Sequence, residues 1–284
     1  MTNMELKYLN VIITGASGGI GSAIARALAA KGARLLLCGR DQAKLDALKQ
    51  SLAGEHHTLS ADLTSSGGQC QLHQAAGVFS PKVLINCLGV NQLSMLEASD
   101  TCDTRAMMAV NLEAPINCCR TLLPLLKRQS EAAIINVGSI LGSIGYPGSS
   151  LYCASKFGLR GFTEALEREL ADSKIKVLYF APRATDTELN TESMRQLNSA
   201  LGNRQDSPEW VADILCRDLA DNRRGRRFIG WPEKLFVRIN ALLPGLVNND
   251  TRKKLPLIRQ FCQRAMPIQD TANPITEGEK HEAI

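Results

Sequence analysis

Short apolar runs alternate with longer amphipathic stretches from residue 10 to about residue 230. The apolar runs are nearly continuous, as in Val11-Ile12-Ile13 and Val83-Leu84-Ile85, and such runs are typical of strands covered on both faces. Strands of this kind form parallel sheets, because helical crossovers join each strand to the next. The sequence therefore predicts one α/β domain, a doubly wound parallel sheet with helices on both faces.

The boundaries of the elements follow from the same pattern. Strands are predicted at Asn10–Thr14, Leu35–Cys38, Thr58–Ala61, Val83–Asn86, Ala133–Val137, Val177–Phe180 and Arg227–Ile229. Helices are predicted at Ile20–Ala30, Asp41–Leu52, Thr104–Lys127, Ser150–Ala171 and Pro208–Leu219. Pro115 is expected to interrupt or bend the third of these helices. The segment from Arg183 to Asp206 is polar without a clear period, so no element is predicted there.

The positive charge is confined to one part of the chain. The net charge is +5, and residues 223–264 contribute 11 basic and 2 acidic side chains, or +9, which leaves −4 elsewhere. General nucleic-acid binding is therefore not expected. The apolar content of the basic segment sets it apart as well. We expect a main domain over residues 1–230, an apolar and basic amphipathic arm over 231–264, and a disordered tail over 265–284.

The cysteines and the N-terminal residues indicate the compartment. Nine cysteines without a CxxC pair or a Cys/His cluster suit a reducing environment, and no metal site is expected. Glu5 and the immediate start of the first strand argue against a signal peptide, and no apolar run is long enough to cross a bilayer. We expect a cytoplasmic protein, with peripheral contact to a membrane surface left open.

A glycine-rich turn lies between the first predicted strand and helix. Its sequence is Thr14-Gly15-Ala16-Ser17-Gly18-Gly19-Ile20-Gly21. Glycines let a backbone approach a pyrophosphate closely, and the N-terminus of the following helix offers unpaired N–H groups and a positive dipole end. This turn predicts a dinucleotide-binding, Rossmann-type fold.

A proton donor can be assembled from three side chains further along. Tyr152 and Lys156 lie one helical turn apart, and Ser139 ends an apolar, strand-like run. Reducing a carbonyl requires a hydride on carbon and a proton on oxygen. A phenol, whose ordinary pKa is ~10, can supply that proton, and a nearby cation favours the phenolate. Together with the glycine turn, this set predicts a nicotinamide-dependent oxidoreductase acting on a carbonyl or an alcohol.

The spacing Thr-Gly-x-x-x-Gly-x-Gly, with Tyr-x-x-x-Lys, resembles the single-domain branch of the short-chain dehydrogenase/reductase family over roughly residues 8–230. The resemblance implies that Gly15, Gly19 and Gly21 form the loop, and that Ile20, Ser17 and neighbouring groups hold the pyrophosphate. It also implies a catalytic set in which Ser139 donates to the substrate oxygen and Lys156 binds the nicotinamide ribose. Its members are Ser139, Tyr152, Lys156 and Asn111, of which Asn111 supports a water path to the lysine.

The segment after the second strand bears on the choice of cofactor. It reads Cys38-Gly39-Arg40, without the acidic residue that would bind the ribose hydroxyls of NAD. The Arg40 guanidinium suits a 2′-phosphate, so we expect NADP (NADPH). The alternative is a solvated arginine that precedes a helix cap at Asp41.

Other positions match the family only in part. Asp62 and Leu63 resemble its adenine-contacting pair, and Asn86 and Gly89 match an Asn-Asn-Ala-Gly motif that Cys87 and Leu88 depart from. Pro182 and Thr187 match the motif Pro-Gly-x-Val-x-Thr, which implies that the Thr185 backbone and the Thr187 hydroxyl face the nicotinamide amide. Arg183 replaces the glycine and would be strained in a left-handed turn. Either the turn differs, or Arg183 has a local task, such as contacting a phosphate of the cofactor or the substrate.

The arm suggests an apolar substrate. Residues 231–261 combine large apolar side chains with Lys and Arg, which suits a helix in a membrane interface, a lid over a substrate channel, or an arm packed in a dimer. We expect a homo-oligomer, a dimer or tetramer, that reduces an apolar or lipid-like ketone such as a 3-ketoacyl thioester. An NAD-dependent hydroxysteroid or alcohol dehydrogenase, a non-catalytic nucleotide-binding protein and a membrane-surface protein stay open as alternatives.

Overall fold

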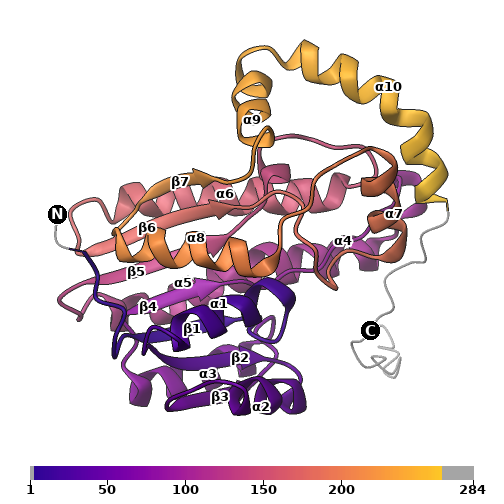
Figure 1. The fold of residues 1–284 in the computed structure, drawn as a ribbon. Coiled ribbons are helices and arrows are strands. Elements are labelled where there is room, and N and C mark those ends of the chain that lie inside the picture. Colours follow the sequence, from indigo (N-terminus) through magenta and orange to yellow (C-terminus); the bar gives the residue numbers. More distant parts are fainter. Residues whose placement is uncertain (1–2, 264–284) are drawn as a thin grey trace, which may run out of the picture.

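The computed structural model describes residues 3–263, and its centre is one parallel sheet (Figure 1). The strand order is β3-β2-β1-β4-β5-β6-β7, with every neighbouring pair parallel. The strands are β1 (Asn10–Thr14), β2 (Arg34–Gly39), β3 (His56–Ser60), β4 (Val83–Asn86), β5 (Ala132–Val137), β6 (Ile175–Ala181) and β7 (Gly225–Phe228). The predicted doubly wound α/β fold is confirmed.

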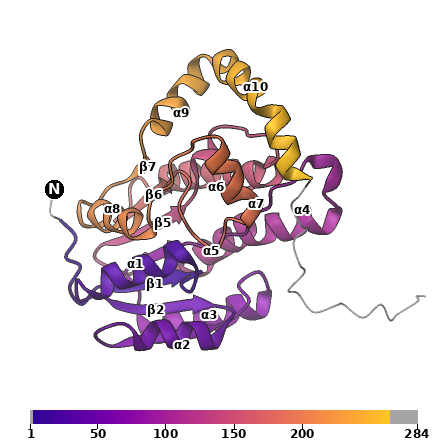
Figure 2. The ribbon, with the colours of Figure 1, turned by 45° about the vertical axis from the view of Figure 1, so that its right-hand side comes forward.

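Helices cover both faces of the sheet, as Figures 1 and 2 show. The helices of the main body are α1 (Gly19–Ala29), α2 (Gln42–Gln50), α3 (Ser66–Phe79), α4 (Thr101–Met108), α5 (Ala114–Leu126), α6 (Ser150–Glu169), α7 (Glu192–Ala200) and α8 (Pro208–Ala220). On one face, α1 packs beside α8, with Leu28 and Leu215 fully buried against the strands. On the other face, α3, α5 and α6 bury Leu72, Leu122 and Leu166. Both faces are therefore dry, as continuous apolar strands require.

The structure differs from the predicted elements in places where the apolar period is weak. Helix α3 was not predicted, because its sequence begins with glycines, but Ser65 caps it by accepting a hydrogen bond from the Gly68 amide at 3.0 Å. Helix α7 was not predicted either. The irregularity expected near Pro115 lies earlier, as a π-helical turn, η2 (Ala109–Glu113), between α4 and α5. Strand β7 begins at Gly225, slightly before its predicted start.

The C-terminal arm consists of two helices, α9 (Glu233–Leu242) and α10 (Pro244–Cys262), which form an arch outside the sheet layers in both views (Figures 1 and 2). Near one foot of the arch, Val237 packs on Ile140 and Ile144, in and after the short 3-10 helix η3 (Ile140–Gly142). At the other foot, Ile258 and Phe261 of α10 pack on α7 and Leu93. The arm thus spans the segment that follows β5.

None of the helices within residues 3–263 combines the length and apolarity needed to cross a bilayer. The tail predicted over 265–284 lies outside the described residues. The division into a main domain over 1–230 and an arm over 231–264 stays a proposal.

Candidate active site

The predicted site residues gather at the carboxyl edge of the sheet. Thr14, Asn86 and Val137 end β1, β4 and β5, and Pro182 directly follows β6. The strand order reverses between β1 and β4, which is where ligands bind in open sheets of this type. The edge therefore brings the glycine turn and the Tyr152 helix to one place.

The glycine turn is shaped by close backbone approaches. Gly15 has φ +66°, and a Cβ there would lie 2.7 Å from the Cys87 carbonyl oxygen. A Cβ on Gly21 would overlap the Gly15 carbonyl oxygen. Helix α1 begins at Gly19 after the N-cap residue Gly18, which has no side chain to cap the helix, so the first N–H groups of the helix are left for a ligand. The turn has the shape and polarity that a pyrophosphate requires.

Two neighbours of the turn come from distant parts of the chain. A Cβ on Gly19 would lie 2.5 Å from the Thr187 Cγ2 atom, which follows β6. A Cβ on Gly39, at the end of β2, would lie 3.4 Å from the Ser17 hydroxyl oxygen. The structure thus brings Ser17 beside the end of β2, and Thr187 beside the start of α1, as a dinucleotide site needs.

The Arg40 side chain is exposed at the end of β2, and within residues 3–263 it forms no ion pair. Asp41 caps α2, because its carboxylate accepts a hydrogen bond from the Lys44 amide at 3.0 Å. Both parts of the alternative reading of this segment are thus present: a solvated arginine and a capping aspartate. A guanidinium without a carboxylate partner remains available for a phosphate.

The next two predicted contacts are partly occupied by local structure. One Asp62 carboxylate oxygen accepts hydrogen bonds from the Thr64 amide at 3.0 Å and the Thr64 hydroxyl at 2.7 Å. The Leu63 side chain is buried in the core, so Leu63 can offer a ligand only its backbone.

A buried polar network joins the cofactor side to the catalytic helix. The Asn86 side chain accepts from the Thr14 hydroxyl at 3.2 Å and donates to the Asn136 carbonyl oxygen, Oδ1, at 2.9 Å. Asn136 in turn donates to the Thr163 hydroxyl on α6 at 2.9 Å. Because the Asn86 side-chain amide is used in this network, only the backbone of Asn86 can bind a ligand. Asn136 and Thr163 were not predicted, although an asparagine inside an apolar strand was a visible signal.

Asn111 is held at the π-helical turn and is fully buried. Its Oδ1 atom accepts from the Val90 amide at 2.8 Å, and its Nδ2 atom donates to the Val90 carbonyl at 2.9 Å and to the Ser155 hydroxyl at 3.1 Å. A Cβ on Gly89 would lie 3.8 Å from both Asn111 Oδ1 and Lys156 Nζ. The structure therefore brings Asn111, Gly89 and Lys156 together, at a type of helix irregularity that is frequent in functional sites.

Tyr152 and Lys156 are buried side by side on α6. The Lys156 Nζ atom lies 5.7 Å from the centre of the Tyr152 ring and donates to the Val137 carbonyl at 3.2 Å. Ser139 follows β5, and its hydroxyl accepts from the Leu141 amide at 3.1 Å. The Ser139 hydroxyl lies near enough to Tyr152 to lower the pKa of that phenol. All members of the predicted catalytic set are thus placed in one region.

The expected effect of the lysine on the tyrosine is not found. Burial raises the pKa of Tyr152 to about 12, although the nearby Ser139 hydroxyl opposes the rise. Burial also lowers the pKa of Lys156 to about 8, because the ammonium loses solvation. Desolvation is the largest cause of both shifts, and Tyr152 is protonated at neutral pH.

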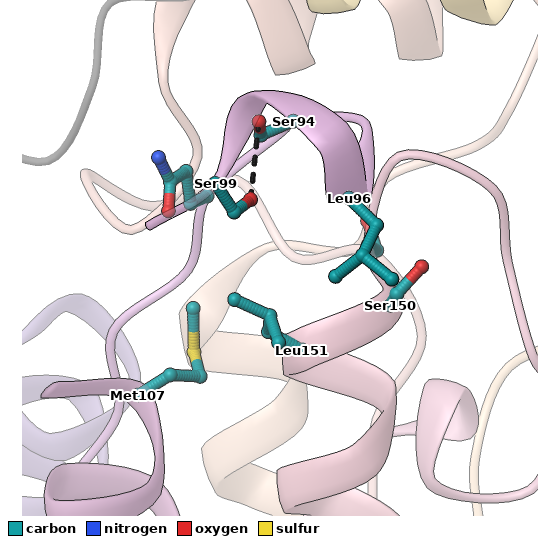
Figure 3. Close-up of a pocket in the computed structure, with 8 residues that line it drawn as sticks. Ser94, Leu96, Ser99, Met107, Ser150 and Leu151 are labelled. Carbon is teal, nitrogen blue, oxygen red and sulfur yellow. Dashed lines mark hydrogen bonds between the residues drawn. The ribbon is translucent and has the colours of Figure 1, made fainter. Parts of the chain in front are cut away.

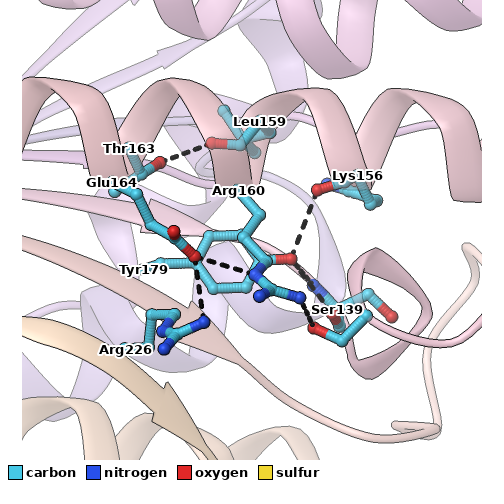
Figure 4. A network of polar contacts seen from close by, with 9 residues as sticks. Ser139, Lys156, Leu159, Arg160, Thr163, Glu164, Tyr179 and Arg226 are labelled. Atoms are coloured by element: carbon cyan, nitrogen blue, oxygen red, sulfur yellow. Dashed lines mark hydrogen bonds and ion pairs between the residues drawn. The ribbon is translucent and has the colours of Figure 1, made fainter. Parts of the chain in front are cut away.

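Tyr179, on β6, positions Ser139 and was not predicted. Its hydroxyl accepts from the Ser139 amide at 3.2 Å and donates to the Ser139 carbonyl at 3.0 Å, as Figure 4 shows. A Cβ on Gly138 or Gly142 would overlap the Tyr179 side chain, so these glycines leave room for it. A tyrosine inside a buried strand was the signal, because a buried hydroxyl requires partners.

The backbone and the side chain of Arg183 both differ from those of the glycine that the family motif has at this position. It has no positive φ, so the turn differs from the left-handed one that a glycine would allow. Its guanidinium pairs with Asp206 at 2.6 Å and Glu233 at 3.0 Å and donates to the Trp231 carbonyl at 2.8 Å. Arg183 therefore has both a different turn and a local task, and that task is to pair with carboxylates. Arg183 ties the loop after β6 to the arm.

The other predicted residues of this loop are held by local hydrogen bonds. The Pro182 carbonyl accepts from the Ile140 amide at 3.0 Å, which joins the loop to η3. Thr185 is buried, and its carbonyl accepts from the Asn190 side chain at 2.7 Å. The Thr185 hydroxyl donates to the Arg183 carbonyl at 3.1 Å. These bonds fix Thr185 two residues before Thr187, whose side chain lies against Gly19 of the glycine turn.

A small cavity lies beside the N-terminus of α6, as Figure 3 shows. It holds about 10 Å³, which is room for a single water. Its lining residues are Gln92, Ser94, Leu96, Ser99, Met107, Ser149, Ser150 and Leu151. A larger hollow of about 330 Å³ lies at Trp210 and Arg227, on α8 and β7, away from the catalytic set. The small cavity borders the catalytic set, because Leu151 precedes Tyr152 and the Met107 sulfur accepts a hydrogen bond from Asn111 Nδ2 at 3.0 Å.

The family model for short chain dehydrogenases matches residues 9–198. A nodulation protein G from Rhizobium sp. (strain N33) is 33% identical over 71% of this chain and 84% of its own length. The chain therefore belongs to the short-chain dehydrogenase/reductase family, an oxidoreductase family that uses nicotinamide cofactors.

Other relatives extend the likeness in different directions. A 3-oxoacyl-(acyl-carrier-protein) reductase from Bos taurus is 33% identical over 65% of this chain and 79% of its own length. A dehydrogenase/reductase SDR family member 7B from Bos taurus is 29% identical over 83% of this chain and 78% of its own. The crystal structure of a dehydrogenase/reductase from Sinorhizobium meliloti 1021 shares 25% identity with a TM-score of 0.69, over 79% of this chain and 95% of that one.

Proposed function

We propose that the chain is an NADPH-dependent reductase of ketones, which can also run the reverse oxidation of a secondary alcohol. The observation that carries this proposal is the group formed by Ser139, Tyr152 and Lys156 at the edge of the sheet. Tyr152 is protonated at neutral pH, as an ordinary phenol is, and this is the form that a proton donor requires. A protein that only binds a nucleotide needs no such donor.

Each member of the catalytic set has a role in this proposal. Bound NADPH would supply the hydride. The Ser139 hydroxyl donates a hydrogen bond to the substrate oxygen, and Tyr152 gives its proton to the alkoxide that develops there. The Lys156 ammonium stabilises the resulting phenolate and binds the nicotinamide ribose. Asn111, at the π-helical turn, supports a water path to Lys156.

The glycine turn fits a nicotinamide dinucleotide, because Gly15 and Gly21 permit a tight backbone turn that a Cβ would prevent and because α1 has no side-chain cap. Arg40 supports the choice of NADPH, since its guanidinium is exposed and unpaired within residues 3–263. The proposed cofactor contacts are Gly15, Ser17, Gly19, Ile20, Gly21, Arg40, Asp62, Leu63, Asn86, Gly89, Tyr152, Lys156, Pro182, Thr185 and Thr187.

The proposed substrate is an apolar ketone such as a 3-ketoacyl thioester. The arm supports this, because Val237 and Val247 pack on Ile140 and Ile144, which belong to the segment that joins Ser139 to Tyr152. The Bos taurus relative named as a 3-oxoacyl reductase supports the same class. A sugar would find few hydrogen-bond partners among these apolar side chains.

The assembly and compartment are proposed as well. The cysteine content favours a reducing, cytoplasmic compartment. We propose a dimer or tetramer, with residues 1–230 as the dinucleotide-binding and catalytic domain and residues 231–264 as the arm.

The experiment is a spectrophotometric assay of NADPH oxidation with 3-ketoacyl thioesters of increasing chain length. We expect turnover that favours long chains and a clear preference for NADPH over NADH. Oxidation of secondary alcohols or hydroxysteroids with NAD alone would replace this proposal with the NAD-dependent alternative. NADPH binding without turnover on any ketone or alcohol would favour a non-catalytic protein.

A further inference from the structure

The elbow between α9 and α10 exposes more large apolar side chains than any other part of residues 3–263. Of the 11 large apolar residues that are exposed, 6 lie between 231 and 246. At the elbow itself, Leu242, Leu243 and Leu246 are 80%, 58% and 60% exposed. Exposed leucines scattered singly are normal, but a continuous group marks an interaction site.

The same region is cationic. Lys234, Arg238 and Lys253 are exposed and, within the described part of the chain, pair with no carboxylate. The two acids of the arm are already neutralised, because Glu233 pairs with Arg183 at 3.0 Å and Asp250 with Lys254 at 2.6 Å. The field around the elbow is therefore positive.

The cations and the leucines share helix faces. Lys234, Arg238 and Leu242 follow one another at intervals of four residues along α9, and Leu246 and Lys253 lie two turns apart on α10. We call these five residues, with Leu243, the elbow surface. The junction of α9 and α10 lies at the outermost point of the arch in both views (Figures 1 and 2), and all six side chains of the elbow surface are exposed.

The chemistry of the elbow surface selects among partners. A second copy docked symmetrically would bring the same unpaired cations together, which costs free energy. A nucleic acid would satisfy the cations but leave the leucines in water. An anionic lipid bilayer satisfies both, because its headgroups attract Lys and Arg while its acyl boundary takes up leucine side chains.

We propose that the elbow surface binds the face of an anionic lipid bilayer. Leu242, Leu243 and Leu246 enter the boundary between headgroups and acyl chains, and Lys234, Arg238 and Lys253 pair with headgroup phosphates. This proposal does not rest on the ketone-reductase activity, because none of these residues belongs to the cofactor or catalytic set.

The experiment is flotation of the full-length chain with two kinds of vesicle, phosphatidylcholine alone and phosphatidylcholine mixed with phosphatidylglycerol. The chain is expected to float with the mixed vesicles only, and less as salt rises. The variant Leu242→Ser/Leu243→Ser/Leu246→Ser should bind about a hundred-fold more weakly or worse. The control is Val78→Ser on α3, which alters an apolar side chain that is 92% exposed and lies outside the arm. This variant should float like the wild type.

The charge component has its own matched pair. Arg238→Gln/Lys253→Gln should weaken partition into the mixed vesicles roughly thirty-fold. Each cation near an anionic surface strengthens partition by a similar factor, and the factors for the two cations multiply. Lys44→Gln/Lys49→Gln, on exposed positions of α2, should change nothing. All variants alter exposed side chains, so their melting temperatures should match that of the wild type.

Three results would overturn the proposal. The first is a wild-type chain that does not float with the mixed vesicles. The second is a leucine variant that floats as well as the wild type. The third is a wild-type oligomer in vesicle-free buffer that the leucine variant reduces to a smaller mass, because the elbow surface would then bind a second copy of the chain.

Discussion

The carboxyl edge of the sheet and the C-terminal arm are held in place by different kinds of contact. At the edge, polar side chains such as Asn86, Asn111 and Asn136 are fully or almost fully buried, and each has partners on more than one element. The arm touches the body through two small apolar clusters and the Arg183 ion pairs, while its elbow faces solvent. The sheet therefore fixes the proposed chemistry, whereas the elbow of the arm presents an exposed surface to a partner.

The largest expected effect concerns the tie between the two regions. Arg183→Met leaves Asp206 and Glu233 without their cation, and Asp206 has only 9% of its side chain exposed. Removing one partner of a buried pair costs about 3–5 kcal/mol, so we expect a loss of that size in the free energy of unfolding, measured with urea.

The matched control for this change is Arg195→Met, which removes a surface pair with Glu192 whose side chains are 41% and 69% exposed. A loss below ~1 kcal/mol is expected there. Equal losses for the two variants would show that the arm is not fastened by Arg183.

Much of the edge could be predicted from the sequence, because its signals are local. Gly15, Gly21, Tyr152 and Lys156 act through backbone shape or one helical turn, and short windows of sequence show both. Arg183 could not be predicted, since its partners Asp206 and Glu233 lie on other segments and only the fold brings them together. The pKa of Lys156 was missed for the same reason, because burial depends on the whole domain.

The next effect tests the cofactor side of the edge. Arg40→Ala should weaken NADPH binding by about 1.5–3 kcal/mol, or roughly ten- to a hundred-fold, and leave NADH binding nearly unchanged. Only NADPH carries the 2′-phosphate that a guanidinium can bind. Fluorescence titration with both cofactors measures this. Equal losses would return Arg40 to the status of a solvated arginine.

A third prediction follows from the pKa of Lys156, which burial lowers to about 8. The ammonium is present below that pH and lost above it, so the rate of ketone reduction should be flat below pH 8. Above that value it should fall about tenfold per pH unit, since the proposed role needs the cation. A rate that stays constant up to pH 10 would remove the charge of Lys156 from the mechanism.

The lowered pKa of Lys156 also predicts that the free energy of unfolding rises with pH, in contrast to the fall in rate. The unfolded lysine keeps its ordinary pKa of 10.5, so the unfolded state binds more protons between pH 8 and 10.5 and stability rises with pH in that window. Relative to Lys156→Met, the wild type should gain about 3 kcal/mol across it. Denaturant unfolding of both proteins at several pH values measures the difference.

The smallest effect concerns Tyr179. Tyr179→Phe removes the hydroxyl that holds the Ser139 backbone and should lower kcat roughly five- to tenfold, the equivalent of one hydrogen bond, while the KM for NADPH stays the same. A purely structural role would lower the melting temperature and leave kcat of the folded fraction intact.

The central claim is that the edge of the sheet carries out proton transfer through Tyr152. The most direct measurement is single-turnover oxidation of bound NADPH by a 3-ketoacyl thioester in Tyr152→Phe, beside a titration of NADPH binding. Because the variant keeps the ring and loses only the donor, we expect a rate about 10²–10⁴-fold lower with nearly unchanged NADPH affinity. A variant that keeps more than about a tenth of the wild-type rate would contradict the claim.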